Sequence, residues 1–287
     1  MKAALPKIVR RINALRTQVA AWRASGETVA LVPTMGALHD GHLALVEEVQ
    51  KRAGRVVVSI FVNPAQFGPN EDLARYPRDE RGDTAKLARL GTDLVYAPSP
   101  AEIYPTGFAS KVLVNGPAKA GLEDKYRPDH FAGVATVVAK LLIQCQPDIA
   151  IFGEKDYQQL MVIRRMTRQL ALPIEIVAGE TSRAEDGLAL SSRNGYLDAA
   201  QRAEAVALAR ELQGVVAELR RGRRDWAALE AAAMDALAGR GWKVDYVAIR
   251  RQADLGAPAD GEALVVLGAA RIGSTRLIDN VEVGVAT

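Results

Sequence analysis

The feature that most constrains the fold is an alternation of short apolar runs with helical patterns through the first two-thirds of the chain. The apolar runs predict five buried strands, at residues 28–34, 55–62, 93–98, 148–153 and 174–179. Helical patterns lie between them, at residues 41–53, up to about 90, at 130–144 and at 156–170. This alternation is typical of parallel βαβ units. We therefore expect an α/β fold with a Rossmann-like, doubly wound parallel sheet that binds ligands at the carboxyl ends of its strands.

The pattern changes after residue 197. Two amphipathic helices are predicted at 198–222 and 225–241, followed by short strands at 243–250, 262–273 and 275–283. This order predicts a smaller α+β domain. We place the boundary near Thr181, which gives an N-terminal domain at 1–181 and a smaller C-terminal domain at 182–287.

The charge of the chain argues little for a nucleic-acid partner. Its 287 residues include 37 basic and 34 acidic ones, with a net charge of +3. A basic stretch, Arg210–Trp226, raises the alternative of a non-catalytic nucleic-acid-binding protein. The solvated end of an amphipathic helix explains that stretch more simply. We expect no nucleic-acid partner.

The single cysteine, Cys145, lies in an apolar helical pattern, where it can form neither an internal disulfide nor a thiolate metal cluster. The first twenty residues do not have the pattern of a signal peptide. No apolar stretch reaches the roughly 18 residues that a membrane span requires. These features predict a cytoplasmic protein with no membrane partner.

The stretch Pro33–His42, PTMGALHDGH, places two of the three histidines three positions apart, directly after the first predicted strand. Gly36 and Gly41 permit close approach of the backbone to a ligand, and the start of the following helix favours an anion such as phosphate. A metal site would need a further strong ligand, and a structural role for the pair is the third alternative. Phosphate binding fits the setting best.

Two other polar strings have chemistry suited to phosphates. The GEKD string at 153–156 follows a predicted strand, where its lysine can reach a phosphate and Gln158 or Gln159 can bind a substrate. The LSSRN string at 190–194 offers hydroxyl and guanidinium donors for a triphosphate. Taken alone, GEKD is better explained as a solvated surface turn and LSSRN as a turn that caps the next helix. There is no Walker sequence or nucleophile elbow, and the three loops together predict an enzyme that acts on a nucleoside triphosphate.

Several strings carry a family resemblance. HDGH at 39–42 resembles the HxGH signature of the nucleotidyltransferase superfamily, which includes class I aminoacyl-tRNA synthetases, and LSSRN is similar to its KMSKS-type loop. PTMGALHDGH, SIFVNPAQF, EDLARYPR, RPDHFAGVATVV, FGEKDYQQL, DGLALSSRNGYL and RLIDN, in this order between Pro33 and Asn280, resemble the pantothenate synthetase family specifically. The resemblance implies ATP-dependent condensation of (R)-pantoate with β-alanine through a pantoyl adenylate, releasing AMP and diphosphate. It also implies Mg²⁺ with ATP as co-substrate, and a homodimer.

The resemblance implies roles for individual residues. His42 matches the catalytic proton donor, His39 its phosphate-binding companion, and Lys155 a lysine on the phosphates. Gln66 and Gln159 match the pantoate-binding glutamines, and Gln66 is also linked to β-alanine. The ATP-binding residues implied are Met35, Gly36, Ala37, Leu38, His39, Asp40, Gly41, His42, Gly153, Glu154, Lys155, Asp156, Ser182, Leu190, Ser191, Ser192 and Arg193.

Three further assignments concern the edge of the implied site. Asn63 and Arg127 match an outer substrate pocket. Ser182 stands at the adenine-contacting position, where the family often has valine; because that contact is made by the backbone, we expect the serine to serve. Gly82 replaces one member of an acidic pair associated with magnesium, which leaves Asp83 as the candidate metal ligand. We then expect Mg²⁺ to be held mainly by ATP oxygens and water.

The main rival is another adenylate-forming enzyme of the same superfamily that uses a different acid. Gln66 and Gln159 favour a small hydroxylated acid over such an alternative. A tRNA synthetase is disfavoured because no separate anticodon-binding region is recognisable and the charge is nearly balanced.

Overall fold

The computed structural model describes residues 5–69 and 71–284, which divide into two compact units. Unit 1 contains the described residues up to Val114, together with 127–154 and 159–180. Unit 2 contains 115–126, 155–158 and the described residues from Thr181 onward. The long C-terminal stretch of unit 2 thus begins beside the predicted domain boundary, while two short segments of the N-terminal half also belong to it.

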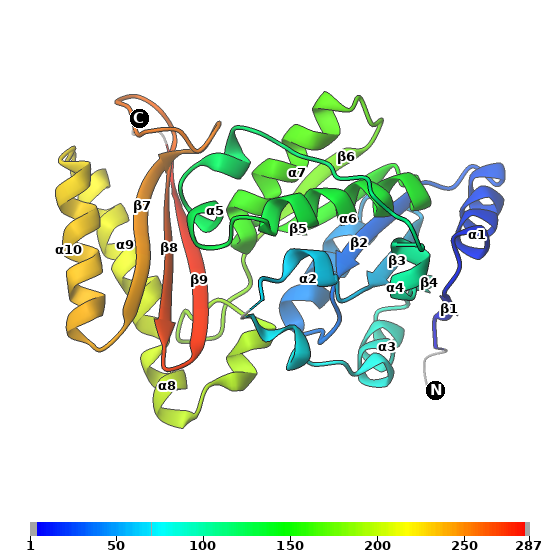
Figure 1. The fold of residues 1–287 in the computed structure, drawn as a ribbon, viewed down its shortest axis with the longest axis horizontal. Helices are drawn as coiled ribbons and strands as arrows, with labels where there is room; N and C mark the ends of the chain where they lie inside the picture. The colour runs from blue at the N-terminus through cyan, green and yellow to red at the C-terminus, as the bar shows by residue number, and fades with distance from the viewer. Residues whose placement is uncertain (1–4, 70, 285–287) are drawn as a thin grey trace. The chain divides into compact units, whose positions relative to one another are not determined.

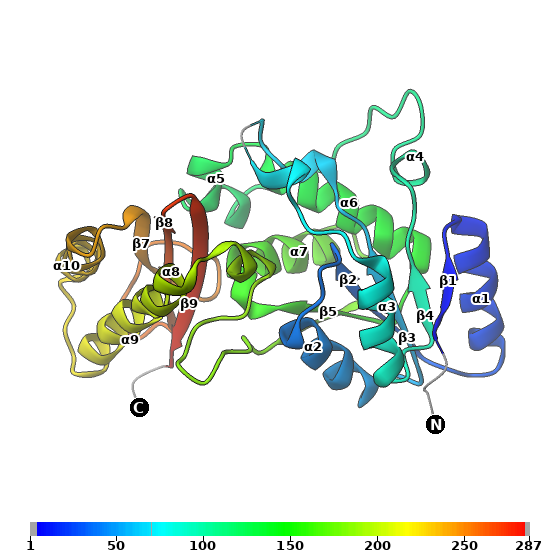
Figure 2. The same ribbon diagram turned by 90° about the horizontal axis from the view of Figure 1, so that it is seen from below.

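Unit 1 is built on a parallel sheet with strand order β1-β4-β3-β2-β5-β6. Its strands are β1 (Lys7–Val9), β2 (Val29–Thr34), β3 (Arg55–Ile60), β4 (Leu94–Tyr96), β5 (Ile149–Gly153) and β6 (Glu175–Gly179). All five predicted strands are present. The prediction missed β1, which pairs with β4 at the edge of the sheet (Figure 2), because three residues are too few to show a period of two.

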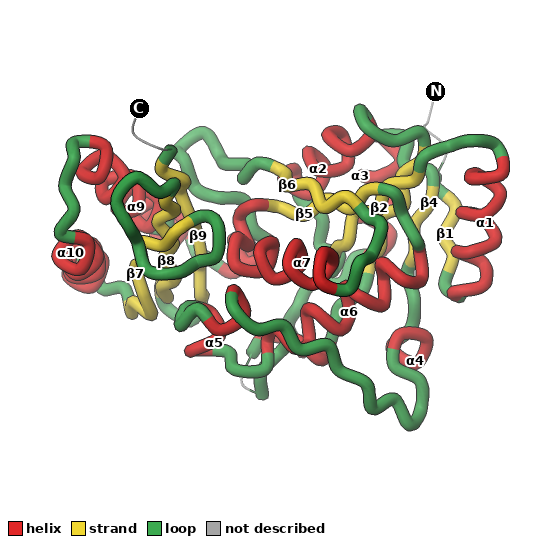
Figure 3. Tube along the Cα trace, turned by 90° about the horizontal axis from the view of Figure 1, so that it is seen from above, coloured by secondary structure: helices red, strands yellow, loops and turns green. Residues whose placement is uncertain are grey.

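Helices cover both faces of this sheet (Figure 3), which confirms the doubly wound fold. One face carries α2 (Asp40–Gln50) and α3 (Glu80–Arg89), whose apolar side chains form a buried cluster with β2, β3 and β5. The other face carries α6 (His130–Cys145) and α7 (Tyr157–Gln169), with α1 (Ile12–Ala24) against α6. A short helix, α4 (Pro100–Ile103), follows β4.

The strand order reverses at β2, which lies between β3 and β5. Pairing of β2 with β3 continues to Thr34, whereas its pairing with β5 ends at Leu31. Pro33 has no backbone N–H to donate, and a central strand tolerates it here because pairing with β5 has already ended. Ligands of doubly wound sheets bind at the carboxyl ends of the strands beside such a reversal. The chain segments at that position are those after β2 and β5.

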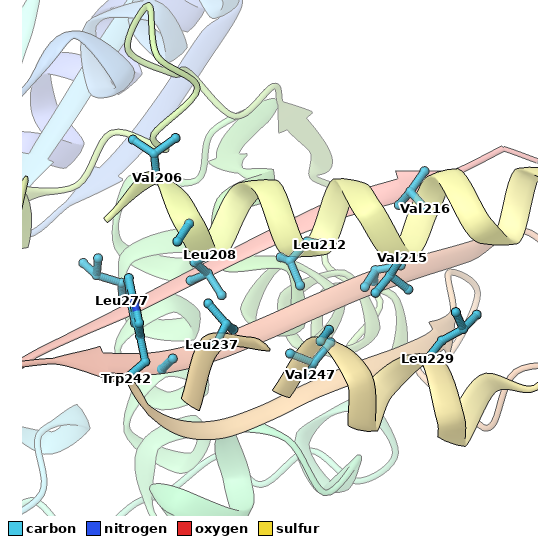
Figure 4. Packing of buried hydrophobic residues seen from close by; sticks show 14 of the residues in the cluster. Val206, Leu208, Leu212, Val215, Val216, Leu229, Leu237, Trp242, Val247 and Leu277 are labelled. Carbon is cyan, nitrogen blue, oxygen red and sulfur yellow. The ribbon is translucent and has the colours of Figure 1, made fainter. Parts of the chain in front are cut away.

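Unit 2 contains an antiparallel sheet of β7 (Lys243–Arg251), β8 (Leu264–Ile272) and β9 (Thr275–Val283). Helices α9 (Val206–Arg220) and α10 (Trp226–Gly239) cover one face of this sheet (Figure 1). Figure 4 shows Leu212 of α9 and Leu237 of α10 packed over Val247 and Leu277. Burial of each such leucine contributes roughly 1.5–3 kcal/mol to stability. The predicted smaller α+β domain is therefore confirmed as a fold.

Two details of unit 2 differ from the sequence prediction or add to it. The single helix predicted at 198–222 is divided at Ala205 into α8 (Ala199–Glu204) and α9. Ala205 is fully buried, and the helical periodicity of the sequence shows no sign of the division. A short helix, α5 (Glu123–Tyr126), also belongs to this unit.

No helix among the residues described here is long and apolar enough to cross a bilayer. Cys145 is buried at the end of α6, and burial raises the pKa of its thiol to about 12. The thiol therefore stays protonated at neutral pH.

Candidate active site

The loop after β2 contains two successive residues in the left-handed region, Gly36 with φ 80° and Ala37 with φ 51°. The N–H of Gly36 donates to Oγ1 of Thr34 at 3.2 Å. A Cβ on Gly36 would lie 3.1 Å from both Asp83 Oδ2 and Ile60 Cγ2. Glycine therefore meets two demands here, a positive φ and a tight space.

Asp83 of α3 holds the next part of this loop. Its Oδ2 accepts a hydrogen bond from the N–H of Ala37 and its Oδ1 one from the N–H of Leu38, both at 2.8 Å. The residue is 1% exposed, and burial raises the pKa of its carboxyl although the two N–H groups oppose that rise. Lys86, one turn further along α3, donates to the carbonyl of Leu38. Two side chains of α3 thus fix the shape of the loop.

His39 and His42 form a capping box at the start of α2. Nδ1 of His39 accepts from the N–H of Gly41 at 3.2 Å, and Nδ1 of His42 accepts from the N–H of His39 at 3.3 Å. A ring nitrogen that accepts carries no proton, so each neutral imidazole has its N–H at Nε2. The pair combines a structural role in capping with a donor on each ring.

Most backbone N–H groups of the loop between β2 and α2 are already hydrogen-bonded, which changes how an anion would be bound at this helix start. The N–H groups of Gly36, Ala37, Leu38, His39 and Gly41 all have acceptors within the chain. A phosphate at this position would therefore meet imidazole N–H groups and the positive end of the helix dipole rather than a row of free backbone donors. The residue spacing could not show this, because it does not reveal which groups already have partners.

Gln66 lies in the 3₁₀ helix Pro64–Gln66 after β3, and its amide has a partner on each side. Its Nε2 donates to Sδ of Met35 at 3.2 Å, and its Oε1 accepts from Nδ2 of Asn63 at 3.0 Å. Asn63 is 1% exposed, and its Oδ1 accepts from the hydroxyl of Tyr104 at 2.7 Å. Unit 1 thus brings together a predicted pantoate-binding residue, a predicted ATP-binding residue and a predicted residue of the outer pocket.

The first turns of α6 hold the backbone around Gln66. A Cβ on Gly133 would clash with the backbone carbonyl of Ala65, so the helix and this segment can approach only because residue 133 is glycine. Nδ1 of His130 lies 3.0 Å from the carbonyl oxygen of Gln66, and Nη2 of Arg127 donates to the same oxygen at 3.3 Å. The position of Gln66 is therefore set from α6.

Arg127 also forms a bidentate ion pair with Glu71, with Nε–Oε1 and Nη2–Oε2 both at 2.7 Å. Burial raises the pKa of the Glu71 carboxyl. The hydrogen bonds and charge of the Arg127 guanidinium lower that pKa by more, so the net pKa is below its usual range. His130 lies 3.2 Å from Nη1 of Arg127. The sequence analysis gave no role to His130 or Glu71. Arg127 precedes α6 and lies three positions before His130, and this closeness in sequence was the signal for the histidine.

The GEKD string is divided between the two units: Gly153 and Glu154 belong to unit 1, Lys155 and Asp156 to unit 2. Nζ of Lys155 lies 3.5 Å from Oδ2 of Asp156. The carbonyl of Lys155 accepts from Nδ2 of Asn280 at 2.9 Å. Its backbone is thus anchored to β9.

The structure distinguishes the two glutamines of the YQQL string. The amide of Gln158 is engaged within unit 2, where Oε1 accepts from the N–H of Glu123 at 2.9 Å and Nε2 donates to the carbonyl of Pro117 at 2.7 Å. Gln159 is half-buried near the start of α7 and belongs to unit 1. Of the two, Gln159 is therefore the better candidate for a substrate contact.

The serine loop is organised within unit 2. Oγ of Ser191 accepts from the N–H of Arg193 at 3.2 Å and caps the 3₁₀ helix Ser192–Tyr196. The N–H of Leu190 donates to the carbonyl of Ser182 at 2.9 Å. The predicted adenine-contacting position and the predicted triphosphate-binding string are thus neighbours in this unit.

Both carboxylate oxygens of Asp83 already accept a backbone N–H. The part of the chain described contains no group of three or more His, Cys, Asp or Glu side chains that could hold a metal ion.

Comparisons with known proteins identify the family of the chain. The family model described as pantoate-beta-alanine ligase matches residues 7–282. The chain is 55% identical over 279 residues to a pantothenate synthetase of Paramagnetospirillum magneticum, covering 96% of this chain and 97% of that protein.

Solved structures show the same fold. Pantothenate synthetase from Thermus thermophilus superposes with a TM-score of 0.88 at 46% identity, covering 97% of this chain and 99% of that one. The Francisella tularensis pantoate-beta-alanine ligase, solved with beta-gamma ATP and beta-alanine, gives a TM-score of 0.77 at 32% identity over 96% and 97% of the two chains. This chain belongs to the pantoate–β-alanine ligase family.

Proposed function

We propose that this chain condenses (R)-pantoate with β-alanine at the expense of ATP, giving pantothenate, AMP and diphosphate. The observation that carries the proposal is the family match over residues 7–282, which includes the histidine capping box at the carboxyl end of β2. In the first step a pantoate carboxylate oxygen attacks the α-phosphorus of ATP, and the bond to diphosphate breaks. In the second step the β-alanine amine attacks the carbonyl carbon of the pantoyl adenylate, AMP leaves, and the amine loses a proton.

For unit 1 we propose that Met35–His42, Gly153 and Glu154 bind ATP. His42 and His39 donate hydrogen bonds from Nε2 to phosphate oxygens while charge moves onto the departing diphosphate. Their capping bonds through Nδ1 support this role, since they fix both the tautomer and the ring positions. The amides of Gln66 and Gln159 bind pantoate, and Gln66 also contacts β-alanine. Asn63 and Arg127 support Gln66 at the edge of the substrate pocket.

For unit 2 we propose that Lys155 binds the phosphates as a mobile cation and Asp156 lies near the ribose. Ser182 contacts adenine through its backbone, and Leu190, Ser191, Ser192 and Arg193 bind the triphosphate. The hydrogen bond between Leu190 and Ser182 supports treating these positions as one nucleotide-binding segment. We propose residues 1–181 and 182–287 as the two functional domains, the second acting as a lid.

We propose that Mg²⁺ accompanies ATP and is held mainly by ATP oxygens and water. Both carboxylate oxygens of Asp83 already accept a backbone N–H, from Ala37 and Leu38. Only the remaining lone pairs of these oxygens could bind the ion. When bound, the ion would neutralise phosphate charge.

We also propose that the protein works as a cytoplasmic homodimer. The chain has a single cysteine and so no internal disulfide, which supports a reducing compartment. Sedimentation equilibrium would test the dimer directly.

The decisive experiment is exchange of labelled diphosphate into ATP. Exchange should require pantoate and proceed without β-alanine, because the adenylate forms before the amine reacts. Exchange that is absent with pantoate but present with another carboxylic acid would instead identify a different adenylate-forming enzyme.

A further inference from the structure

Strand β9 carries two adjacent buried polar residues, Asp279 and Asn280, at the end of the RLIDN string. They are only 5% and 6% exposed. Buried polar groups are costly unless they are hydrogen-bonded. Their partners within unit 2 therefore indicate what they do.

Successive residues of a strand point to opposite faces of the sheet. Leu277, Val281 and Val283 pack with α9 and α10, so Asp279 shares their face. Asn280 lies on the opposite face with Glu282. The two neighbours can thus hold two different segments of the chain.

Asn280 holds the segment that contains Lys155. Its Nδ2 donates to the carbonyl of Lys155 at 2.9 Å. Two residues along the same face, Oε1 of Glu282 accepts from the hydroxyl of Tyr157 at 2.8 Å. This segment is therefore held to β9 at two points, once through the Lys155 backbone and once through the Tyr157 side chain, which limits the positions that the long lysine side chain can reach.

Asp279 holds the segment that leads to the serine loop. Its carboxylate, 4% exposed, accepts from Nη1 and Nη2 of Arg183 at 2.7 and 2.9 Å. Arg183 also donates to the carbonyl of Gly187 at 3.1 Å and pairs through its backbone with Ala189. A bidentate arginine–carboxylate pair fixes orientation as well as distance. The segment is thereby anchored one residue after Ser182 and two residues before Ser191.

We propose that Asp279 and Asn280 are positioning residues. They hold the Lys155 backbone and the segment Ser182–Arg193 to the same strand, β9, so that both segments are correctly placed to bind ATP. The inference rests on the proposed nucleotide-binding function of those two segments. Small displacements of binding groups cost large factors in rate and affinity, so loss of either anchor should weaken ATP use specifically.

The test compares Asn280→Ala with Gln252→Ala in pantoate-dependent diphosphate exchange. Gln252 is a matched control in the same unit, because its amide Nε2 also donates to a backbone carbonyl, that of Leu264 at 2.9 Å. We expect Asn280→Ala to raise the KM for ATP about tenfold with little change in the KM for pantoate, the effect of roughly one lost hydrogen bond. Gln252→Ala should leave both constants unchanged, even if both variants lose similar thermal stability.

The second anchor is tested with Asp279→Asn, which keeps one acceptor for Arg183 but removes the negative charge and the second hydrogen bond of the pair. It should also raise the KM for ATP, and the double variant Asp279→Asn with Arg183→Lys should show less than the sum of the two single effects, because both change one ion pair. Additive effects would show that the pair does not act as one anchor.

Lys155→Ala separates failure of this inference from failure of the proposed function. Suppose that Lys155→Ala abolishes exchange, while Asn280→Ala and Gln252→Ala have the same KM for ATP. The positioning role of Asn280 is then wrong, and the nucleotide-binding role of the Lys155 segment stands. If Lys155→Ala leaves exchange unchanged, the nucleotide role of this segment fails and the inference fails with it.

Discussion

His39 and His42 cap one helix together: their ring centroids lie 4.1 Å apart, Nδ1 of His39 accepts the N–H of Gly41, and Nδ1 of His42 accepts the N–H of the N-cap residue His39. The two rings are therefore fixed in position and tautomer by the same bonds that begin the helix. Substitution of either ring changes a cap and a donor at once, so the two effects must be separated by the choice of variant.

His42→Asn and His42→Ala separate these effects. The asparagine oxygen can still accept the N–H of His39, whereas alanine cannot, and loss of a cap costs about 1 kcal/mol. We expect His42→Ala to lower the free energy of unfolding by about this amount and His42→Asn by clearly less. Diphosphate exchange should fall strongly and similarly in both. If exchange instead follows stability, the role of His42 is structural only.

Gly133→Ala should displace the segment that contains Gln66. The new methyl group would clash with the backbone carbonyl of Ala65, which cannot rotate away as a side chain could. We expect a destabilisation of about 1–3 kcal/mol together with a higher KM for pantoate. Gly214→Ala on α9 is the matched control, since nothing lies within 4 Å of a Cβ added there. It should stabilise the protein by about 0.5–1 kcal/mol without altering the KM for pantoate. An unchanged KM for pantoate in Gly133→Ala would refute the positioning of Gln66 from α6.

The ion pair of Glu71 with Arg127 should make stability depend on pH in a defined direction. The folded-state pKa of Glu71 is lowered, so its contribution is fully present above the unfolded value of about 4.3 and is lost as pH falls through the folded pKa. The difference in free energy of unfolding between wild type and Glu71→Gln should be about 1–3 kcal/mol and constant near neutrality, and should shrink below about pH 4. Urea unfolding at several pH values would measure it, and a difference that grows on acidification would contradict the assignment.

Asp83→Asn tests whether this residue holds the loop or a metal ion. The asparagine amide would point a donor at the N–H of Ala37 or Leu38, so we expect a loss of about 1–3 kcal/mol in stability and slower diphosphate exchange. Raising the Mg²⁺ concentration should not restore exchange, because the defect lies in the loop. Recovery at high Mg²⁺ would identify Asp83 as a metal ligand instead.

The architecture was largely accessible from the sequence. The continuous apolar runs at 28–34 and 55–62 and the helical period between them are strong signals, and their strands and helix are present as predicted. The short strand β1 was not accessible, because it is set by pairing with β4. The division at Ala205 was not accessible either, because the helical pattern continues through it.

The sequence motifs of the candidate site were predictable, but the hydrogen bonds that connect them were not. The spacing of His39 and His42 indicated a shared position at a helix start, yet it could not show that the rings cap the helix. Likewise, nothing local in the sequence links Asp83 to a loop 45 positions earlier, or Asn280 to Lys155, 125 positions earlier. Those contacts depend on how distant elements pack, which residue patterns do not encode.

The buried thiol of Cys145 gives the protein a practical property. Because the chain has one cysteine and its thiol is both inaccessible and protonated, it offers almost no competing reaction to thiol-directed reagents. A single cysteine introduced on an exposed position would therefore take up a dye or spin label at that position alone. Two such cysteines, one in each unit, would let distance measurements in solution follow the two units through the catalytic cycle without first removing a native residue.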